Sequence, residues 1–338
     1  MQTPVFWKTD LETISNMASS VRRAQVKELC RTPGGRPLTA FCYGQTRPVE
    51  RLANYSSACG AGDRDCYSPR TDKTPTVVLL GAVHGGETEG TAALMNLISL
   101  LESGRDLAGA ENPALIEAAQ GVRLVIVPVC NPDGRARVQP DAMVGLTGDE
   151  LRYWMQGTWK NGSLCGWPDC KKRHPIKEHA GFLGGYYNDD GINLMHDNFF
   201  RPMAAETQAI LDLCDSERAD WVLHMHGGSN SVNDLLQPSY VPVEVNEAVR
   251  ALAQRCDAVA KGEGLRFTVR DLPQKEHGDT PPSFNLVSAV HHVCGAVSAC
   301  FESNECIIDQ PGEHFTHEQI YRSHMILFEQ CLRTAQIV

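Results

Sequence analysis

Residues 76–90 read Thr76-Val77-Val78-Leu79-Leu80-Gly81-Ala82-Val83-His84-Gly85-Gly86-Glu87-Thr88-Glu89-Gly90. The apolar run before Gly81 is typical of a buried strand, and the apolar segment at 91–102 predicts a helix. His84 and Glu87 would then lie on the turn between them, where open α/β sheets place their ligand-binding groups. The glycines let the backbone turn tightly enough for both side chains to face one point. Such a pair suits zinc. The alternative is that His84 is exposed to solvent and that Glu87 stands at the start of a helix, where its charge complements the helix dipole.

The rest of the chain alternates between strand and helix patterns. Strands are expected at 36–43, 122–129, 221–223, 265–269 and 295–302, and helices near 10–20, 204–216, 243–261 and 316–332. This alternation predicts an α/β fold, with residues 1–338 forming a single three-layer α/β/α domain around a central mixed, twisted sheet. Residues 45–74 are expected to form a long loop, and residues 138–190 a functional or insertion-like segment, because neither stretch shows clean periodicity.

The amino-acid composition indicates which partners the protein can bind and in which compartment it is expected. The 338 residues carry a formal net charge of -10, which argues against nucleic acid as a partner because phosphate binding needs clustered Lys and Arg. The 13 cysteines are an odd number without paired spacing, as is typical of reduced thiols in the cytoplasm. No signal peptide and no membrane-spanning run is visible. We therefore expect a soluble, cytoplasmic protein without a membrane partner, whose oligomeric state the sequence leaves open.

Two further strand ends carry groups that bind metals or protons. The strand at 221–223 leads into His224 and His226, and the strand at 295–302 ends at Glu302. A catalytic zinc needs three protein ligands and one open position for water. Two His and one Glu would supply the ligands, and a second carboxylate would then take the proton of the water.

Four motifs, in this order over most of the chain, resemble the M14 family of zinc carboxypeptidases. They are Gly81-x-x-His84-Gly85-x-Glu87, Pro128-x-x-Asn131-Pro132-Asp133-Gly134, Trp221-x-x-His224-x-His226-Gly227-Gly228 and Ser298-x-x-Phe301-Glu302. The resemblance implies a zinc carboxypeptidase-like fold and a zinc ion held by His84, Glu87 and His224. It also implies that Glu302 acts as general base and acid.

Two of these assignments keep an alternative. His224 is preferred as the third ligand because it lies directly at the strand end, but His226 faces the same side, since side chains alternate along a strand. His226 would otherwise shape the substrate pocket. Glu302 is preferred as the base because it follows an apolar strand, and Glu305 is the alternative.

The substrate-binding residues depart from the family pattern. Met195 and His196 stand where the family has an Asn-Arg pair that grips the terminal carboxylate of the substrate. A His cannot reproduce the bidentate contact that Arg makes with a carboxylate. The cation that polarises the carbonyl also lacks a clear counterpart, and the candidates are Arg152, Lys160, Arg135 and Arg137.

The expected function is a zinc-dependent metallohydrolase that cleaves a peptide or amide bond with zinc-activated water and Glu302 as general base. Because the carboxylate grip is altered, a deacylase or amidase for a small acylated amino acid or modified peptide is the alternative substrate class. A catalytically silent binding protein of the same fold is the alternative outside enzymes.

Overall fold

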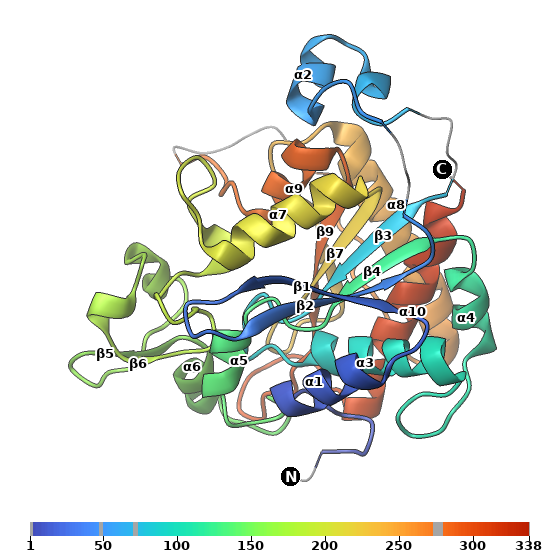
Figure 1. Cartoon of the computed structure of the whole chain (residues 1–338). Helices are drawn as coiled ribbons and strands as arrows, with labels where there is room; N and C mark the ends of the chain where they lie inside the picture. Colours follow the sequence, from blue (N-terminus) through green and yellow to red (C-terminus); the bar gives the residue numbers. More distant parts are fainter. Residues whose placement is uncertain (1–2, 47–49, 70–73, 273–279, 338) are drawn as a thin grey trace.

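A seven-stranded mixed sheet forms the centre of the computed structural model, which describes residues 3–46, 50–69, 74–272 and 280–337 (Figure 1). The strand order is β1-β2-β4-β3-β7-β9-β8. The bounds are β1 (Gln25–Arg31), β2 (Pro37–Tyr43), β3 (Thr76–Leu80), β4 (Arg123–Val127), β7 (Trp221–Gly227), β8 (Asp234–Leu236) and β9 (Val297–Ser303). Strands β4, β3, β7 and β9 run parallel, and the antiparallel pairings of β1, β2 and β8 lie toward the two edges.

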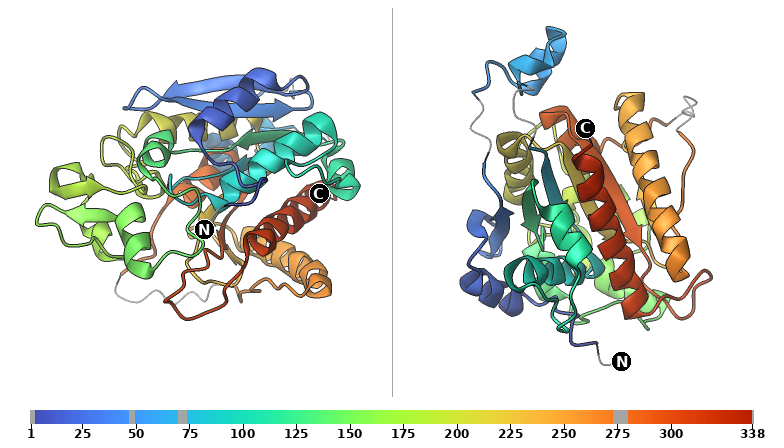
Figure 2. Two further views of the ribbon diagram at one scale, coloured as in Figure 1. Left: turned by 90° about the horizontal axis from the view of Figure 1, so that it is seen from below. Right: turned by 90° about the vertical axis from the view of Figure 1, so that its right-hand side faces the viewer.

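Helices cover both faces of the sheet (Figures 1 and 2). One apolar layer includes residues of α1 (Leu11–Ser20), α3 (Glu89–Ser103), α4 (Pro113–Ala119), α8 (Val243–Ala260) and α10 (His317–Ala335). The other includes residues of α2 (Tyr55–Gly60), α7 (Ala205–Glu217) and α9 (Leu286–Cys294). The predicted three-layer α/β architecture is confirmed.

The parallel strands place their carboxyl ends along one edge of the sheet. Strand β3 pairs with β4 on one side and with β7 on the other, and all five residues of both β3 and β4 are buried. Because helices cover both faces, these strands read as continuous apolar runs rather than as alternating ones. The loops that follow β3, β4, β7 and β9 therefore meet at the edge where open α/β sheets bind ligands.

The expected long loop at 45–74 contains short helices. Helix α2 begins after Asn54, whose side chain accepts the backbone N–H of Ser57, and a 3-10 turn spans Arg64–Cys66. Tyr55 and Ala58 pack into the apolar layer. A helix of six residues is too short to show a helical period in sequence. Residues 47–49 and 70–73 lie outside the described part of the chain.

Other element boundaries also differ from the expectations. Residues 265–269 form no strand, and only an isolated bridge joins Thr268 to Asp234. Strand β1 was not anticipated because its side chains are mostly exposed on a sheet edge, which leaves no apolar alternation to read. Helix α9 was not anticipated because it is apolar nearly all round. Residues 273–279, which precede it, lie outside the described part of the chain.

The segment at 138–190 lies beside the carboxyl edge of the sheet (Figure 1). It follows α5 (Pro132–Arg137) and contains α6 (Gly148–Met155) and a two-stranded sheet of β5 (Gly157–Trp159) and β6 (Ala180–Leu183). Among the described residues, no helix combines the length and apolar character needed to cross a bilayer.

Candidate metal centre

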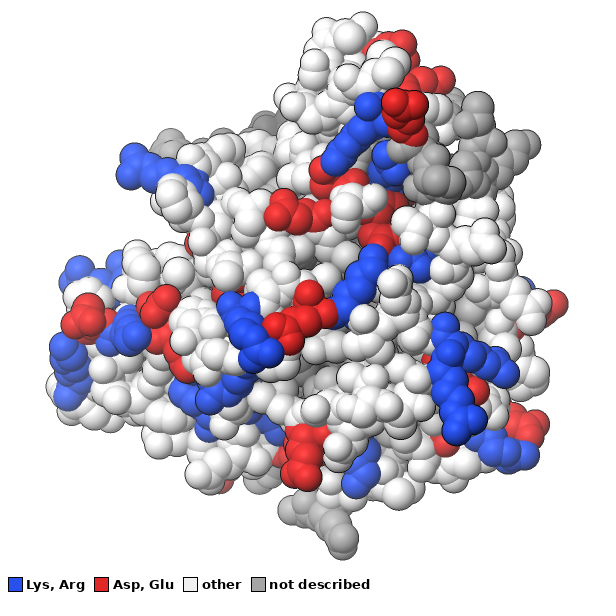
Figure 3. Space-filling model, in the orientation of Figure 1, with Lys and Arg blue, Asp and Glu red and all other residues white. Residues whose placement is uncertain are grey.

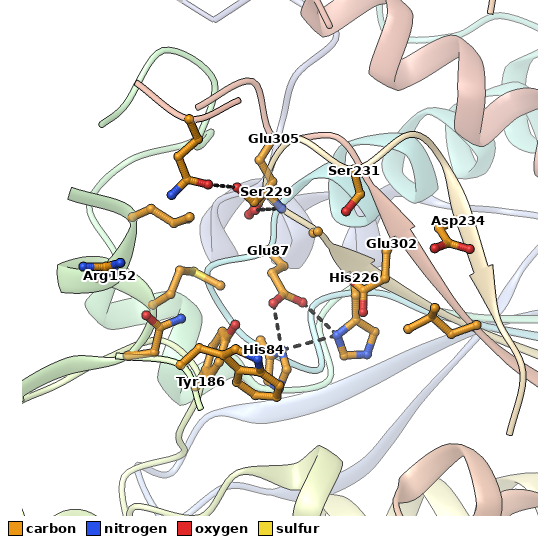
Figure 4. A pocket seen from close by; sticks show the side chains of 18 of the residues that line it. His84, Glu87, Arg152, Tyr186, His226, Ser229, Ser231, Asp234, Glu302 and Glu305 are labelled. Carbon is orange, nitrogen blue, oxygen red and sulfur yellow. Dashed lines mark hydrogen bonds and ion pairs between the residues drawn. The ribbon is translucent and has the colours of Figure 1, made fainter. Parts of the chain in front are cut away.

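Two imidazoles and one carboxylate converge where β3 and β7 end (Figure 4). The Nδ1 atom of His84 lies 2.8 Å from Oε1 of Glu87, and Nδ1 of His226 lies 2.8 Å from Oε2 of the same carboxylate. The two Nδ1 atoms are 3.3 Å apart. All three side chains are buried, so four potential donor atoms surround one point that water barely reaches.

Local backbone geometry explains how His84 and Glu87 reach this point. Both lie on the loop between β3 and α3, which packs closely against the start of α5. A Cβ atom at Gly85 would lie 2.2 Å from the backbone nitrogen of Arg135 and 2.5 Å from the carbonyl carbon of Gly134. No side chain larger than hydrogen fits there, so Gly85 is required for the close approach.

Asn193 orients the ring of His84. Its Oδ1 accepts the backbone N–H of Met195 at 3.0 Å, which identifies the amide oxygen, and the same atom lies 3.2 Å from Nε2 of His84. The proton of the imidazole therefore sits on Nε2, and the lone pair on Nδ1 points at Glu87. Burial lowers the pKa of His84, so its ring is neutral.

This tautomer suits a site that binds a cation. An imidazole lone pair and a carboxylate oxygen 2.8 Å apart repel each other unless both bind the same positive ion. Oε2 of Glu87 lies 2.8 Å from Nδ1 of His226, which can donate to it only when that nitrogen carries a proton. Burial would lower the pKa of His226, but the charge and hydrogen bond of Glu87 outweigh it and raise that pKa. Two imidazoles and one carboxylate are the kinds of donor that suit zinc. The residues present therefore fit the implied metal.

The structure does not bring His224 to this centre. His224 lies two residues earlier in β7, about 6–7 Å deeper in the sheet at the usual rise of a strand. Its side chain is fully buried, and its Nε2 lies 3.1 Å from Oγ of Ser298. The geometry therefore places His226, rather than the preferred His224, beside His84 and Glu87.

Glu302 lies on the neighbouring strand beside His226. The two residues are direct partners in the pairing of β7 and β9, and donor atoms of His226, Cys300 and Glu302 lie within 4.8 Å of one another. Burial raises the pKa of Glu302 to about 7; His226 opposes this shift and the charge of Glu87 adds to it. A carboxylate in this environment is suited to accept a proton near neutral pH.

Glu305 also reaches the cavity but is held differently. Its Oε2 accepts the backbone N–H of Ser229 at 2.7 Å, and its Oε1 is buried without a partner. A Cβ atom at Gly227 would lie 2.4 Å from Oε1 of Glu305, so Gly227 leaves the room that this carboxyl group occupies. Both candidate carboxylates therefore face the same cavity.

A cavity of about 500 Å³ opens beside the converging side chains (Figure 4). Its lining includes all three converging residues and both candidate bases. The other lining residues are Leu151, Arg152, Met155, Gln156, Trp167, Tyr186, Gly227, Gly228, Ser229, Ser231, Asp234, Leu236, Arg270 and Gln310.

The residues expected to bind substrate lie in three different places. Arg152 is on the rim of the cavity, with 54% of its side chain exposed and an ion pair to Asp149 at 3.5 Å. Lys160 is exposed just after β5 and is not among the residues that line the cavity. His196 lines a separate cavity of about 200 Å³, together with His174 and others.

Several residues of the site gave no signal in the sequence. Asn193 lies close to Met195 and His196 in the chain, but a lone amide does not indicate a ligand or a positioning residue there. Gln156 and Tyr186 lie in the segment without periodicity. The adjacent glycines Gly184 and Gly185 are the feature of its sequence that would allow close contact between backbone segments. Arg270, which donates its Nε to Asp234 at 2.8 Å, carried no sequence signal.

Comparison with known proteins gives similarities in sequence and in fold. The sequence model of the M14 peptidase family, described as zinc carboxypeptidase, matches residues 11–264. A metallo-carboxypeptidase from Burkholderia cenocepacia is similar in structure, with a TM-score of 0.60 and 16% identity over 98% of this chain and 70% of that one. A metallo-carboxypeptidase from Pseudomonas aeruginosa, solved in complex with (2-guanidinoethylmercapto)succinic acid, has a TM-score of 0.56 and 14% identity over 95% of this chain and 68% of that one. No curated protein matches the sequence.

Proposed function

Since this chain belongs to the M14 family of zinc carboxypeptidases, we propose that it is a zinc-dependent hydrolase of a peptide or amide bond. The observation that carries the proposal is the convergence of His84, Glu87 and His226, with an imidazole lone pair aimed at a carboxylate. In this proposal Nδ1 of His84, the carboxylate of Glu87 and Nδ1 of His226 hold the ion. Zinc in such a site lowers the pKa of a bound water and polarises a carbonyl.

Glu302 handles the protons of the reaction in this proposal. It accepts a proton from the attacking water as the new C–O bond forms, and it returns that proton to the leaving nitrogen as the C–N bond breaks. Its place opposite His226 supports this role, because the carboxylate faces the same cavity as the ligand set. Glu305 keeps one oxygen on the backbone N–H of Ser229, which favours Glu302 as the base.

A deacylase or amidase remains the second candidate because of the environment of His196. Burial, with the nearby charge of Lys171, lowers the pKa of His196 to about 3, so its ring is neutral at pH 7. Met195 beside it is buried and apolar. Neither residue supplies the positive charge that a terminal carboxylate requires.

Hydrolysis of matched peptides tests the proposal and separates the two candidates. The zinc-loaded protein is expected to cleave blocked dipeptides, and a chelator is expected to abolish the cleavage until zinc is restored. The control is the same dipeptide offered as a free acid and as its C-terminal amide. Cleavage of the free acid alone would indicate a carboxypeptidase, and similar rates would indicate the amidase. A zinc-loaded protein that cleaves neither form would favour the silent binding protein.

The compartment proposed for this hydrolase is the cytoplasm. All 13 cysteines are free thiols, and most of them are buried within the two apolar layers or elsewhere in the core. A reducing environment suits such a set. Fusion of a fluorescent tag to the chain in its native cells would test this location directly.

A further inference from the structure

The cavity lacks a buried cation for the developing oxyanion among the described residues that line it. The two cationic lining residues are Arg152, which is half exposed, and Arg270, which is held by Asp234. Amide hydrolysis places negative charge on the carbonyl oxygen, and enzymes stabilise it with donors that are already in place. A neutral hydrogen-bond donor close to the ligand set would supply this stabilisation.

Tyr186 lies against the ligand set. Its ring stacks on the imidazole of His84, with the ring centroids 4.0 Å apart and the planes inclined by 21°. It also lines the cavity (Figure 4). Its phenol group therefore borders the space where a substrate carbonyl would meet His84 and Glu87.

The backbone holds Tyr186 in this place from two sides. The N–H of Gly85 donates to the carbonyl of Gly185 at 2.7 Å, which ties the segment to the loop of His84. The N–H of Tyr186 donates to the carbonyl of Met155 at 2.9 Å, which ties it to the end of α6. A Cβ atom at Gly184 would lie 2.4 Å from that same carbonyl oxygen. The tyrosine is thus positioned before any substrate binds.

Gln156 sets the orientation of the phenol. Its side chain is buried and hydrogen bonds the hydroxyl group of Tyr186. Oε1 of Gln156 has no hydrogen-bond partner, so the phenol does not donate to it. The amide nitrogen of Gln156 makes this bond, because it is the only other polar atom of that side chain, so the amide N–H donates and the phenol oxygen accepts.

This arrangement leaves the hydrogen of the phenol available to another acceptor. A hydroxyl group that already accepts a hydrogen bond is polarised, and it becomes a stronger donor. A substrate carbonyl in the cavity would be such an acceptor, and its charge would grow as water attacks.

We propose that the hydroxyl group of Tyr186 donates a hydrogen bond to the scissile carbonyl oxygen as its negative charge develops, and that Gln156 positions this hydroxyl. The inference rests on the proposed function, because it assigns a further catalytic residue to the same reaction. No proton is transferred from the phenol. Tyr186 takes the place that the sequence left to Arg152 or Lys160, and Gln156 acts only through Tyr186.

The variant Tyr186→Phe removes the hydroxyl group and keeps the ring that stacks on His84. Loss of one oxyanion donor lowers kcat by about 10²–10³-fold in comparable sites, and we expect that loss here. The KM for a blocked dipeptide and the zinc content are expected to stay close to those of the wild type. The matched control is Tyr187→Phe, which removes the hydroxyl group of the next residue, whose ring is buried and does not line this cavity.

The affinity of a tetrahedral inhibitor distinguishes a catalytic role of Tyr186 from a purely structural one. The affinity of a phosphinic dipeptide should fall in Tyr186→Phe by the same factor as kcat/KM, while the affinity of the cleaved product stays unchanged. Gln156→Leu should lower kcat by a smaller factor, again with KM and zinc content retained. Equal losses of KM, product affinity and zinc content in either variant would indicate a structural role and would overturn the inference.

Two outcomes separate this inference from the function on which it rests. If the wild type cleaves blocked dipeptides and Tyr186→Phe keeps the wild-type kcat, the inference is wrong and the hydrolase proposal stands. If the zinc-loaded wild type cleaves no dipeptide, free or amidated, and does not bind the phosphinic dipeptide, both are contradicted.

Discussion

Glu302 is the general base of the proposed reaction, and apart from the ligand set it is the residue that the reaction needs most. The variant Glu302→Gln keeps the size of the side chain and one acceptor oxygen but cannot take up a proton at neutral pH. We expect kcat to fall by about 10²–10⁴-fold, the range of general acid–base catalysis, while zinc remains bound because Glu302 is not a ligand. Steady-state kinetics and elemental analysis of the purified variant would measure both.

Glu305→Gln is the natural control for this prediction. It keeps an oxygen for the backbone N–H of Ser229 and is expected to lose much less activity. Full activity in Glu302→Gln together with near-complete loss in Glu305→Gln would assign the base to Glu305.

The sequence alone does not distinguish His224 from His226 as the neighbour of His84 and Glu87. Both side chains face the same side of β7, so the strand period of two cannot separate them. What separates them is the depth of each residue below the sheet edge, which depends on how far β7 extends beyond β3. The pairing of His224 with Leu80, the last residue of β3, is a long-range feature that no local pattern reveals.

At the scale of elements, a buried ion pair joins β4 to α7. Arg123, the first residue of β4, donates Nε and Nη2 to the two oxygens of Glu217 at 2.9 Å each, and both side chains are almost fully buried. Lys27 of β1 adds a contact of 3.1 Å to the same carboxylate. The three residues connect an edge strand, a central strand and the helix that covers them.

Removing one partner of this pair should destabilise the fold strongly. Glu217→Leu leaves the buried guanidinium of Arg123 without its carboxylate, and we expect the free energy of unfolding to fall by about 3–5 kcal/mol. Chemical denaturation would measure it. The double variant Arg123→Leu/Glu217→Leu should lose less than the single one, and the exposed pair of Arg105 and Glu111 should contribute under about 1 kcal/mol. A single variant as stable as the wild type would contradict this account.

The same pair makes stability depend on pH. Burial alone would raise the pKa of Glu217, but hydrogen bonds and charge from Arg123 and Lys27 outweigh it and lower the pKa below its usual value. A lowered pKa in the folded state means that the contribution is present at neutral pH and is lost as the pH falls through that value.

Elements with a strong apolar signal were predictable, and the others were not. The strands β3, β4 and β9 and the helices α8 and α10 were predicted close to their observed bounds because they are long or continuously buried. Strand β1 has no alternation of apolar and polar residues that would predict a strand. It is a strand because its backbone pairs with that of β2. The segment at 138–190 was recognised only as functional or inserted, because contacts with the loop of His84 fix its structure.

At the scale of the whole molecule, the surface carries charged side chains of both signs. On the face seen in Figure 3, Lys and Arg side chains are interspersed with Asp and Glu rather than gathered into one basic patch. The architecture was predictable because the four motifs of the zinc carboxypeptidase family occur in the same order over most of the chain. The substrate was not, because the residues that shape the cavity come from loops without a local pattern.

In the proposed function His84, Glu87 and His226 hold one zinc ion, so the zinc stoichiometry of the purified protein and its variants, measured by elemental analysis, is the decisive quantity. We predict about one zinc per chain in the wild type and in His224→Gln, and loss of stoichiometric zinc in His226→Gln, with circular dichroism confirming that both variants are folded. Stoichiometric zinc in a folded His226→Gln variant, or a wild type that cannot be loaded with zinc, would contradict the account.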